Sequence, residues 1–202
     1  MMFQPQVKLE FVRRYCPPKA GWKVFVDIDA SEEGRTGGER MSIEAKSRQQ
    51  DMLCGADTAR ELLEMLGVQV GGDRQHWLRQ HGLPPVAGNR DILAFHLAER
   101  MCLIGEVEGK SSGQPEQKLY KAIGQLVMAA SSDEPAGWQK VLVLVVHGNK
   151  ITAHLQRATA LTKLAISAVA LGTTQPCDRW FFQDSLPPKF RNGELDTALV
   201  NT

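Results

Sequence analysis

The most constraining feature of this sequence is a pair of apolar runs near its middle, at residues 91–97 and 101–107. They read DILAFHL and MCLIGEV, and only Ala98, Glu99 and Arg100 separate them. Two short apolar runs with so brief a connection predict a β-hairpin.

A helical pattern and a third apolar run follow this hairpin. Pro115 suits the first turn of a helix whose apolar stripe extends from Leu119 to Ala130. The run at 141–146, VLVLVV, does not alternate with polar residues, as in a strand that is covered on both faces. A hairpin, a helix and a fully buried strand in this order predict an α/β fold with a mixed central sheet and helices on both faces.

The rest of the chain carries weaker patterns. We expect extended runs at 7–15 and 22–28, a helix at 43–66, a short strand on either side of Trp77, a second long helix at 151–171 and a last short strand at 179–182. Inside the helix at 43–66, Thr58 and Glu61 also fit a capping box that starts a new helix after a break near Gly55.

The polar stretch at 31–40 suggests a boundary in the chain. We therefore divide it into an N-terminal extended arm or hairpin with a polar loop (1–40), a core (41–185) and a C-terminal tail (186–202).

Composition limits the classes to which the protein can belong. Of its 202 residues, 43% are hydrophobic and 23% charged, which is enough to build a core. Lys and Arg number 24 against 23 Asp and Glu, which excludes a polycation or a basic membrane-surface arm but allows a local patch for nucleic acid. The four cysteines form no CxxC pair, and the sequence has no secretory or membrane-spanning pattern, so we expect a cytoplasmic protein with reduced thiols and no membrane partner.

Charged side chains gather where the hairpin ends. Residues two apart in a strand face the same side, so Glu106, Glu108 and Lys110 would line one face, and Asp91 opens the neighbouring strand. Carboxylate oxygens suit a hard divalent cation such as Mg²⁺, which can polarise a phosphoryl oxygen and lower the pKa of a bound water. Lys110 would then orient the attacking water or offset charge in the transition state.

These residues resemble the motif of the PD-(D/E)xK nuclease superfamily, which has the restriction-endonuclease-like fold. The resemblance spans residues 43 to 147 and lies in Asp91 on one strand and Glu108-Gly109-Lys110 on the next, followed by a helix and a buried strand. It implies that Asp91 and Glu108 hold Mg²⁺, for which Mn²⁺ is a substitute. It also implies that the Gly109 carbonyl adds a ligand and that Lys110 positions the water.

The sequence departs from this family in two places. Arg90 stands where the proline of the family name would be. The additional carboxylate of Glu106 leaves the choice of metal ligand between Glu106 and Glu108 open, and we include both.

The resemblance also points to polar residues on the flanking helices. Members of the family carry a glutamate on the helix before the sheet, for which Glu61 or Glu64 is a candidate, unless Glu61 only caps its helix. On the helix after the motif, Gln117 and Lys121 lie four residues apart and share a face. We expect Gln117 to take part in catalysis and Lys121 to contact nucleic acid.

Other interpretations use the same residues. The sequence EVEGK at a strand end is also typical of a solvated turn. The segment from Gly105 to Ser111 resembles a P-loop, but it has one residue too few between its glycines, and two of the residues there are glutamates, which repel phosphate.

We therefore interpret the chain as a Mg²⁺-dependent nuclease that hydrolyses phosphodiester bonds, with DNA as the expected substrate and a homodimer as a possible form. The alternative is a non-catalytic module that binds nucleic acid or protein on a nuclease-like fold. On the nuclease interpretation, Asp91→Ala or Lys110→Ala abolishes cleavage and leaves the fold intact, whereas a binding module tolerates Asp91→Ala.

Overall fold

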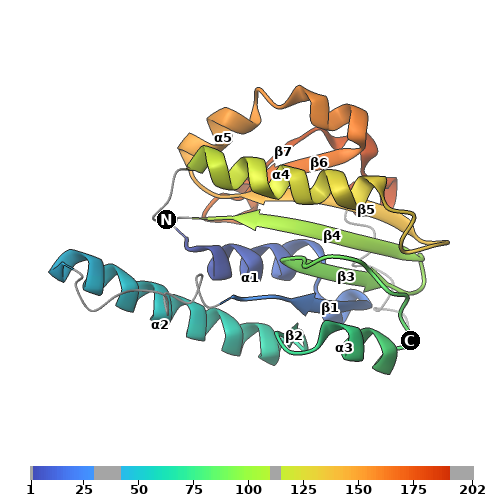
Figure 1. Ribbon diagram of the computed structural model, residues 1–202, viewed down its shortest axis with the longest axis horizontal. Helices are drawn as coiled ribbons and strands as arrows, with labels where there is room; N and C mark the ends of the chain where they lie inside the picture. The colour runs from blue at the N-terminus through green and yellow to red at the C-terminus, as the bar shows by residue number, and fades with distance from the viewer. Residues whose placement is uncertain (1, 30–41, 110–114, 192–202) are drawn as a thin grey trace.

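The computed structural model describes residues 2–29, 42–109 and 115–191. These residues form one seven-stranded sheet in the order β2-β1-β3-β4-β5-β6-β7, with both parallel and antiparallel neighbours (Figure 1). The strands are β1 (Trp22–Val26), β2 (Gln69–Val70), β3 (Ile92–His96), β4 (Met101–Glu108), β5 (Gln139–Val146), β6 (Ile166–Ala170) and β7 (Arg179–Phe181). The α-helices are α1 (Gln4–Tyr15), α2 (Ile43–Met65), α3 (Arg74–Gln80), α4 (Pro115–Ser131), α5 (Asn149–Leu155) and α6 (Pro188–Arg191).

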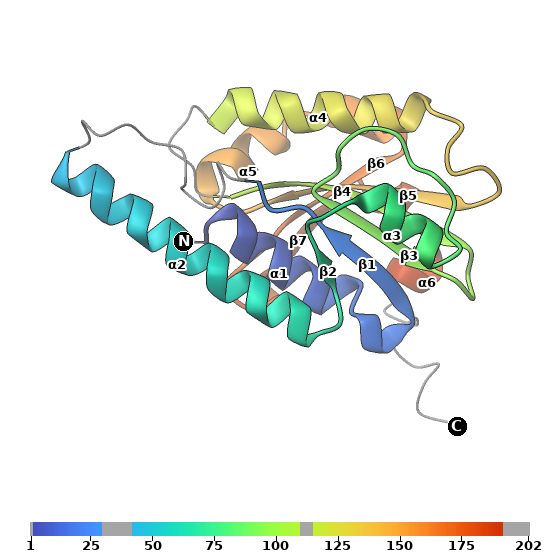
Figure 2. The same ribbon diagram turned by 60° about the horizontal axis from the view of Figure 1, so that its bottom comes forward.

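Helices cover both faces of the sheet (Figure 2). α1 and α2 pack on one face, where Val7 and Leu63 cluster with Leu103 of β4. α3, α4 and α5 pack on the other face, where Leu126 of α4 clusters with Ile104 of β4. The prediction of an α/β fold with a mixed sheet between two helical layers is therefore confirmed.

The predicted hairpin is present, and its register determines where the site residues lie. β3 and β4 are antiparallel, with Ile92 opposite Gly105. α4 then leads into β5, which lies parallel to β4 so that Glu108 pairs with Val146. All residues at 141–146 are buried, as expected for a run without alternation.

The prediction of an extended run at 7–15 is wrong, because this segment belongs to α1. Pro5 lies in the first turn of that helix, and the buried Val7, Phe11 and Val12 recur at helical spacing. A helix followed by β1 therefore stands where we expected an extended arm or hairpin.

Both ends of the described chain belong to the core. Val12 of α1 and Val24 of β1 join the same buried cluster as Phe190 of α6. The polar loop expected at 31–40 and the residues after 191 lie outside the described residues, so the proposed division of the chain stays a prediction.

Two predictions in the second half of the chain also differ from the structure. Trp77 lies in α3, which begins where the backbone N–H of His76 donates to the side chain of Asp73. The expected long helix at 151–171 ends at Leu155 and is followed by a 3-10 turn (Thr159–Leu164) and by β6. Both faces of β6 are buried, so its sequence lacks the alternation that distinguishes a strand from a buried helix.

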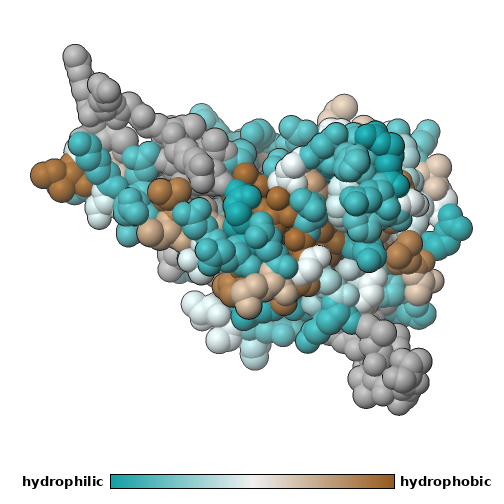
Figure 3. Space-filling view, turned by 90° about the horizontal axis from the view of Figure 1, so that it is seen from below, coloured by the Kyte–Doolittle hydropathy of each residue, from teal (hydrophilic) through white to brown (hydrophobic). Residues whose placement is uncertain are grey.

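α2 is a single helix, so the capping box at Thr58 is not formed and the helix has no break near Gly55. Its first half extends past the sheet, and Ile43 at its start is 85% exposed. Figure 3 shows apolar side chains at the tip of this projection and a further apolar area near the middle of the same face, among hydrophilic side chains. No helix within the described ranges is both long and apolar enough to cross a bilayer.

Candidate active site

The residues that carry the predicted motif lie at the carboxyl end of β4 (Figure 1). Because β3 runs antiparallel to β4, the residue just before β3 lies beside the end of β4. This residue is Asp91, and its Oδ2 accepts a hydrogen bond of 2.7 Å from the backbone N–H of Val107. The hairpin thus brings Asp91 beside the backbone of β4 at Val107.

The carboxylate of Asp91 is directed toward α1. Its Oδ1 lies 2.9 Å from Nζ of Lys8, and its Oδ2 lies 3.5 Å from Nε2 of Gln4. Lys8 is fully buried and also donates to the backbone carbonyl of Asp27 at 2.5 Å. Both oxygens of Asp91 therefore have hydrogen-bond or ion-pair partners supplied by the protein.

Glu106 and Glu108 lie on the opposite face of the sheet. Strand alternation places them with Ile104, which packs against α4. Their exposed fractions are only 2% and 7%. Among the described residues, no hydrogen-bond donor reaches Oε1 of Glu106 or Oε2 of Glu108. Buried carboxylate oxygens without donors are energetically costly, and a bound cation is one way to satisfy them.

This environment disfavours the charged form of both side chains. Burial, and secondarily the charge of Asp91, raises the pKa of Glu106 to about 8, although Arg90 opposes the shift. Burial also raises the pKa of Glu108 to about 7, where Lys118 and Lys121 oppose the shift and Asp91 adds to it. The charge of Asp91 thus acts on both glutamates, and a divalent cation among them would reverse the direction of these shifts.

The guanidinium of Arg90 contacts Glu106 from the side of α4. Its Nη1 lies 3.6 Å from Oε1 of Glu106 and donates to the carbonyl of Gln125 at 3.3 Å. The residue that departs from the family motif is therefore a buried cation beside the extra carboxylate.

Of the residues predicted on α4, Lys121 acts on the site through its charge, and Gln117 is exposed at the start of the helix. Lys118, which the sequence analysis did not select, has a larger effect on Glu108 than Lys121 does. The two lysines are three residues apart and so share a helical face, which is the signal that would have identified Lys118.

Gly109 lies where the end of β4 meets the start of α1. A Cβ atom at this position would lie 2.7 Å from the backbone nitrogen of Gln4, closer than real contacts allow. The lack of a side chain therefore lets α1 approach β4. Lys110 lies outside the described residues, so its predicted role stays a prediction.

Three contributors to the site lie outside the motif: Gln4, Lys8 and Arg90. Lys8 was missed because its apolar neighbours were interpreted as a strand. The side chains of Glu61 and Glu64 are exposed on α2, and the possible role of either in the site stays a prediction.

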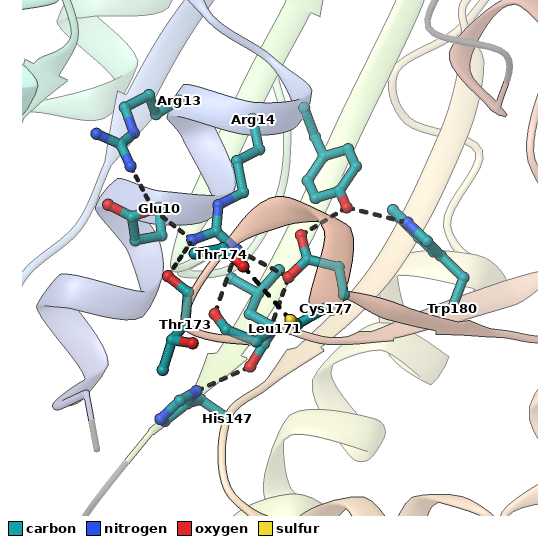
Figure 4. Close-up of polar contacts among 12 residues, drawn as sticks. Glu10, Arg13, Arg14, His147, Leu171, Thr173, Thr174, Cys177 and Trp180 are labelled. Atoms are coloured by element: carbon teal, nitrogen blue, oxygen red, sulfur yellow. Dashed lines mark hydrogen bonds and ion pairs between the residues drawn. The ribbon is translucent and has the colours of Figure 1, made fainter.

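α1 is held in place by a second polar cluster at its other end (Figure 4). Arg14 lies 2.6 Å from Glu10 and 2.8 Å from Asp178, which precedes β7. Tyr15 donates to Asp178 at 2.8 Å and accepts a hydrogen bond from Trp180. These contacts join the carboxyl end of α1 to the segment that leads into β7.

The side chains at this site are of the chemical type that binds a hard cation, but only some of them are placed to do so. Asp91, Glu106 and Glu108 offer carboxylate oxygens, the ligands that Mg²⁺ prefers. Within the described part of the chain, however, no three or more His, Cys, Asp or Glu side chains are gathered closely enough to hold a metal ion. The reason is the position of Asp91, which is paired with Lys8 on the side of α1.

No protein-family model, curated protein or solved structure matches this chain. The resemblance to the nuclease superfamily therefore depends on the motif residues and on the order of the elements.

Proposed function

We propose that this protein is a divalent-metal-dependent nuclease that hydrolyses phosphodiester bonds, with DNA as its first candidate substrate. The observation that carries the proposal is the pair of buried glutamates at the end of β4, Glu106 and Glu108. Among the described residues, Oε2 of Glu108 has no donor and Oε1 of Glu106 has only Nη1 of Arg90 at 3.6 Å, and the charge of Asp91 acts on both glutamates. A cation bound by these carboxylates is the simplest way to stabilise them in their charged form.

The order of elements supports the same proposal. β3, β4, α4 and β5 follow one another as strand, strand, helix and buried strand, the order that the resemblance implies for a restriction-endonuclease-like fold. The antiparallel β3–β4 pair and the parallel β4–β5 pair bring the motif to one end of the sheet.

In this proposal Glu106 and Glu108 are the first ligands of Mg²⁺ or Mn²⁺, and Asp91 joins them only when it separates from Lys8. The Gly109 carbonyl is a further candidate ligand. The metal supplies positive charge that polarises the phosphate and lowers the pKa of a water. Lys110 positions that water, as expected from the sequence.

The side chains of α4 provide phosphate contacts in this proposal. Lys118 and Lys121 place positive charge beside Glu108, and Gln117 is exposed in the first turn of the same helix. Ammonium groups next to an acidic metal centre attract the phosphodiester without binding the metal themselves. A homodimer and a cytoplasmic location remain predictions from the sequence.

Cleavage assays with isosteric variants test the proposal. Plasmid DNA, single-stranded DNA and RNA are incubated with the protein in Mg²⁺, Mn²⁺ or EDTA. We expect metal-dependent cleavage by the wild type and a loss of at least about a hundredfold in Glu108→Gln and Glu106→Gln. Asp57→Asn, an exposed isosteric change on α2, is the matched control. Full metal-dependent cleavage by both site variants would overturn the proposal.

A second candidate is a non-catalytic module that binds nucleic acid or protein. The ion pair between Lys8 and Asp91 favours it, because Asp91 already has a structural role. Such a module binds DNA equally well in EDTA and Mg²⁺, and it retains this binding in Glu108→Gln. Binding of this kind, without cleavage under any condition, would favour the second candidate.

A further inference from the structure

Lys8 is an unusual residue for the interior of a small protein. Its side chain is fully buried on α1, whose neighbouring residues Val7 and Leu9 belong to the hydrophobic core. An ammonium group in such a place requires a partner of opposite charge, because an isolated buried charge is very unfavourable. Asp91, 2.9 Å away, is that partner.

The two faces of the site differ in how their carboxylates are satisfied. Asp91 receives Lys8, Gln4 and the N–H of Val107. Within the described residues, Oε2 of Glu108 is buried without a donor, and Oε1 of Glu106 has only Nη1 of Arg90 at 3.6 Å, beyond hydrogen-bond distance. A cation that needs all three carboxylates must therefore replace a close positive charge at Asp91, whereas it meets an unpartnered oxygen on Glu108.

We propose that Lys8 and a divalent cation are alternative partners of Asp91, so that Lys8 regulates the metal affinity of this site. This inference rests on the proposed function, since it takes Asp91 as a ligand of the same metal as Glu106 and Glu108. Without metal, Lys8 holds the carboxylate and stabilises α1 on the sheet. When the metal takes Asp91, Lys8 keeps its hydrogen bond to the carbonyl of Asp27.

The competition has a measurable consequence. Metal binding has to break the pair between Lys8 and Asp91, so the observed affinity is lower than the intrinsic affinity of the carboxylates. Removal of the lysine charge removes this competition. A variant without it should bind metal more tightly and should depend on metal for its stability, because Asp91 then lacks a counterion.

The experiment measures Mn²⁺ binding by titration calorimetry and thermal unfolding with and without Mn²⁺, in the wild type and in Lys8→Met. We expect Lys8→Met to bind Mn²⁺ about tenfold more tightly. We also expect Mn²⁺ to raise its Tm more than that of the wild type, since a ligand stabilises a protein in proportion to its affinity. If Lys8→Met does not fold without metal, Lys8→Gln, which retains an N–H donor, is measured in its place.

Arg14→Met is the matched control. Arg14 lies on the same helix, is 4% exposed and forms an ion pair of 2.8 Å with Asp178 at the far end of α1. Its loss lowers the Tm as any broken buried ion pair does. It leaves the Mn²⁺ affinity unchanged, because it does not contact the site.

The possible results separate the two proposals. If the wild type and the Lys8 variant bind Mn²⁺ with equal affinity, the competition is wrong and the metal site stands. If neither binds Mn²⁺, the metal-dependent function is wrong, and this inference with it. Tighter binding in the Lys8 variant but not in Arg14→Met supports the competition.

Discussion

At the end of β4, the acidic side chains on the two sides of the sheet differ in the partners that the protein provides for them. On the side of α1, Asp91 has a buried lysine, a side-chain amide and a backbone N–H as partners. On the side of α4, Glu106 and Glu108 are more deeply buried, and within the described residues Oε2 of Glu108 has no donor and Oε1 of Glu106 has only Arg90 at 3.6 Å. The first arrangement stabilises the fold, and the second is the one on which the proposed metal site depends.

This difference changes what a substitution tests. A carboxylate that the protein has already paired contributes to stability, so its removal disturbs the fold together with any activity. A carboxylate that the protein has left without donors destabilises the metal-free fold, so its neutralisation is tolerated or even favourable. The following predictions test this contrast, from the largest expected effect to the smallest.

The largest effect is expected for Asp91→Ala. This change removes the carboxylate that lies 2.9 Å from the fully buried ammonium of Lys8, and the free energy of unfolding should fall by about 3–5 kcal/mol. From the sequence we expected this variant to keep its fold. The ion pair with Lys8 leads us to expect a loss of stability instead. Urea unfolding measures the effect.

The double variant Lys8→Met/Asp91→Ala is the control for this prediction. It removes both charges, so most of the lost stability should return. An Asp91→Ala variant as stable as the wild type would show that Lys8 does not depend on Asp91.

A smaller loss is expected for Gly109→Ala, at the point where β4 meets the start of α1. The new Cβ would lie 2.7 Å from the backbone nitrogen of Gln4, so the two elements must separate, at a cost of about 1–3 kcal/mol. Gly124→Ala is the matched control, since Gly124 lies in α4 with no atom within 4 Å of the added Cβ. That change should stabilise the helix. Equal effects of the two substitutions would contradict this account of the junction.

The pH dependence of stability should reflect the glutamates. Burial raises the pKa of Glu106 from 4.5 to about 8 and that of Glu108 to about 7. Between the unfolded pKa of 4.5 and these folded pKa values, the two glutamates are protonated in the folded protein but ionised in the unfolded chain. The free energy of unfolding therefore falls as the pH rises from about 5 to about 8. We expect the Tm in EDTA to fall by a few degrees over this range.

Mg²⁺ should reduce this fall, because a cation stabilises the ionised carboxylates. Thermal unfolding at several pH values, with EDTA or Mg²⁺, measures both effects. A Tm in EDTA that rises between pH 5 and 8 would contradict the assignment of the shifts to these two side chains, and the variant Glu106→Gln/Glu108→Gln should flatten the profile.

The smallest effect has the opposite sign. Glu108→Gln removes a buried charge but keeps the shape of the side chain, so the metal-free protein at pH 8 should gain about 1 kcal/mol. Urea unfolding at pH 8 in EDTA measures it, with Glu61→Gln on the surface of α2 as the control. A large loss of stability would show that the charge of Glu108 already stabilises the metal-free fold, as the charge of Asp91 does.

Much of the centre of the fold was predictable from local pattern. The hairpin, α4 and β5 follow from short-range periodicity, and strand alternation alone puts Glu106 and Glu108 on one face. β6 was mistaken for helix because a strand buried on both faces has no polar side to reveal its period. α1 was mistaken for a strand because Val7, Leu9 and Phe11 alternate with Lys8 and Glu10, which is the period of a strand.

The sequence by itself determined which chemistry the protein can carry, since it places Asp91 and the two glutamates at the ends of adjacent strands. Only the tertiary structure decided how these groups are partnered. Gln4 and Asp91 are 87 positions apart in the sequence. No local sequence pattern indicates that α1 brings Gln4 and Lys8 to this carboxylate. Contacts of this kind depend on the packing of a helix against a sheet, which is set by the whole core.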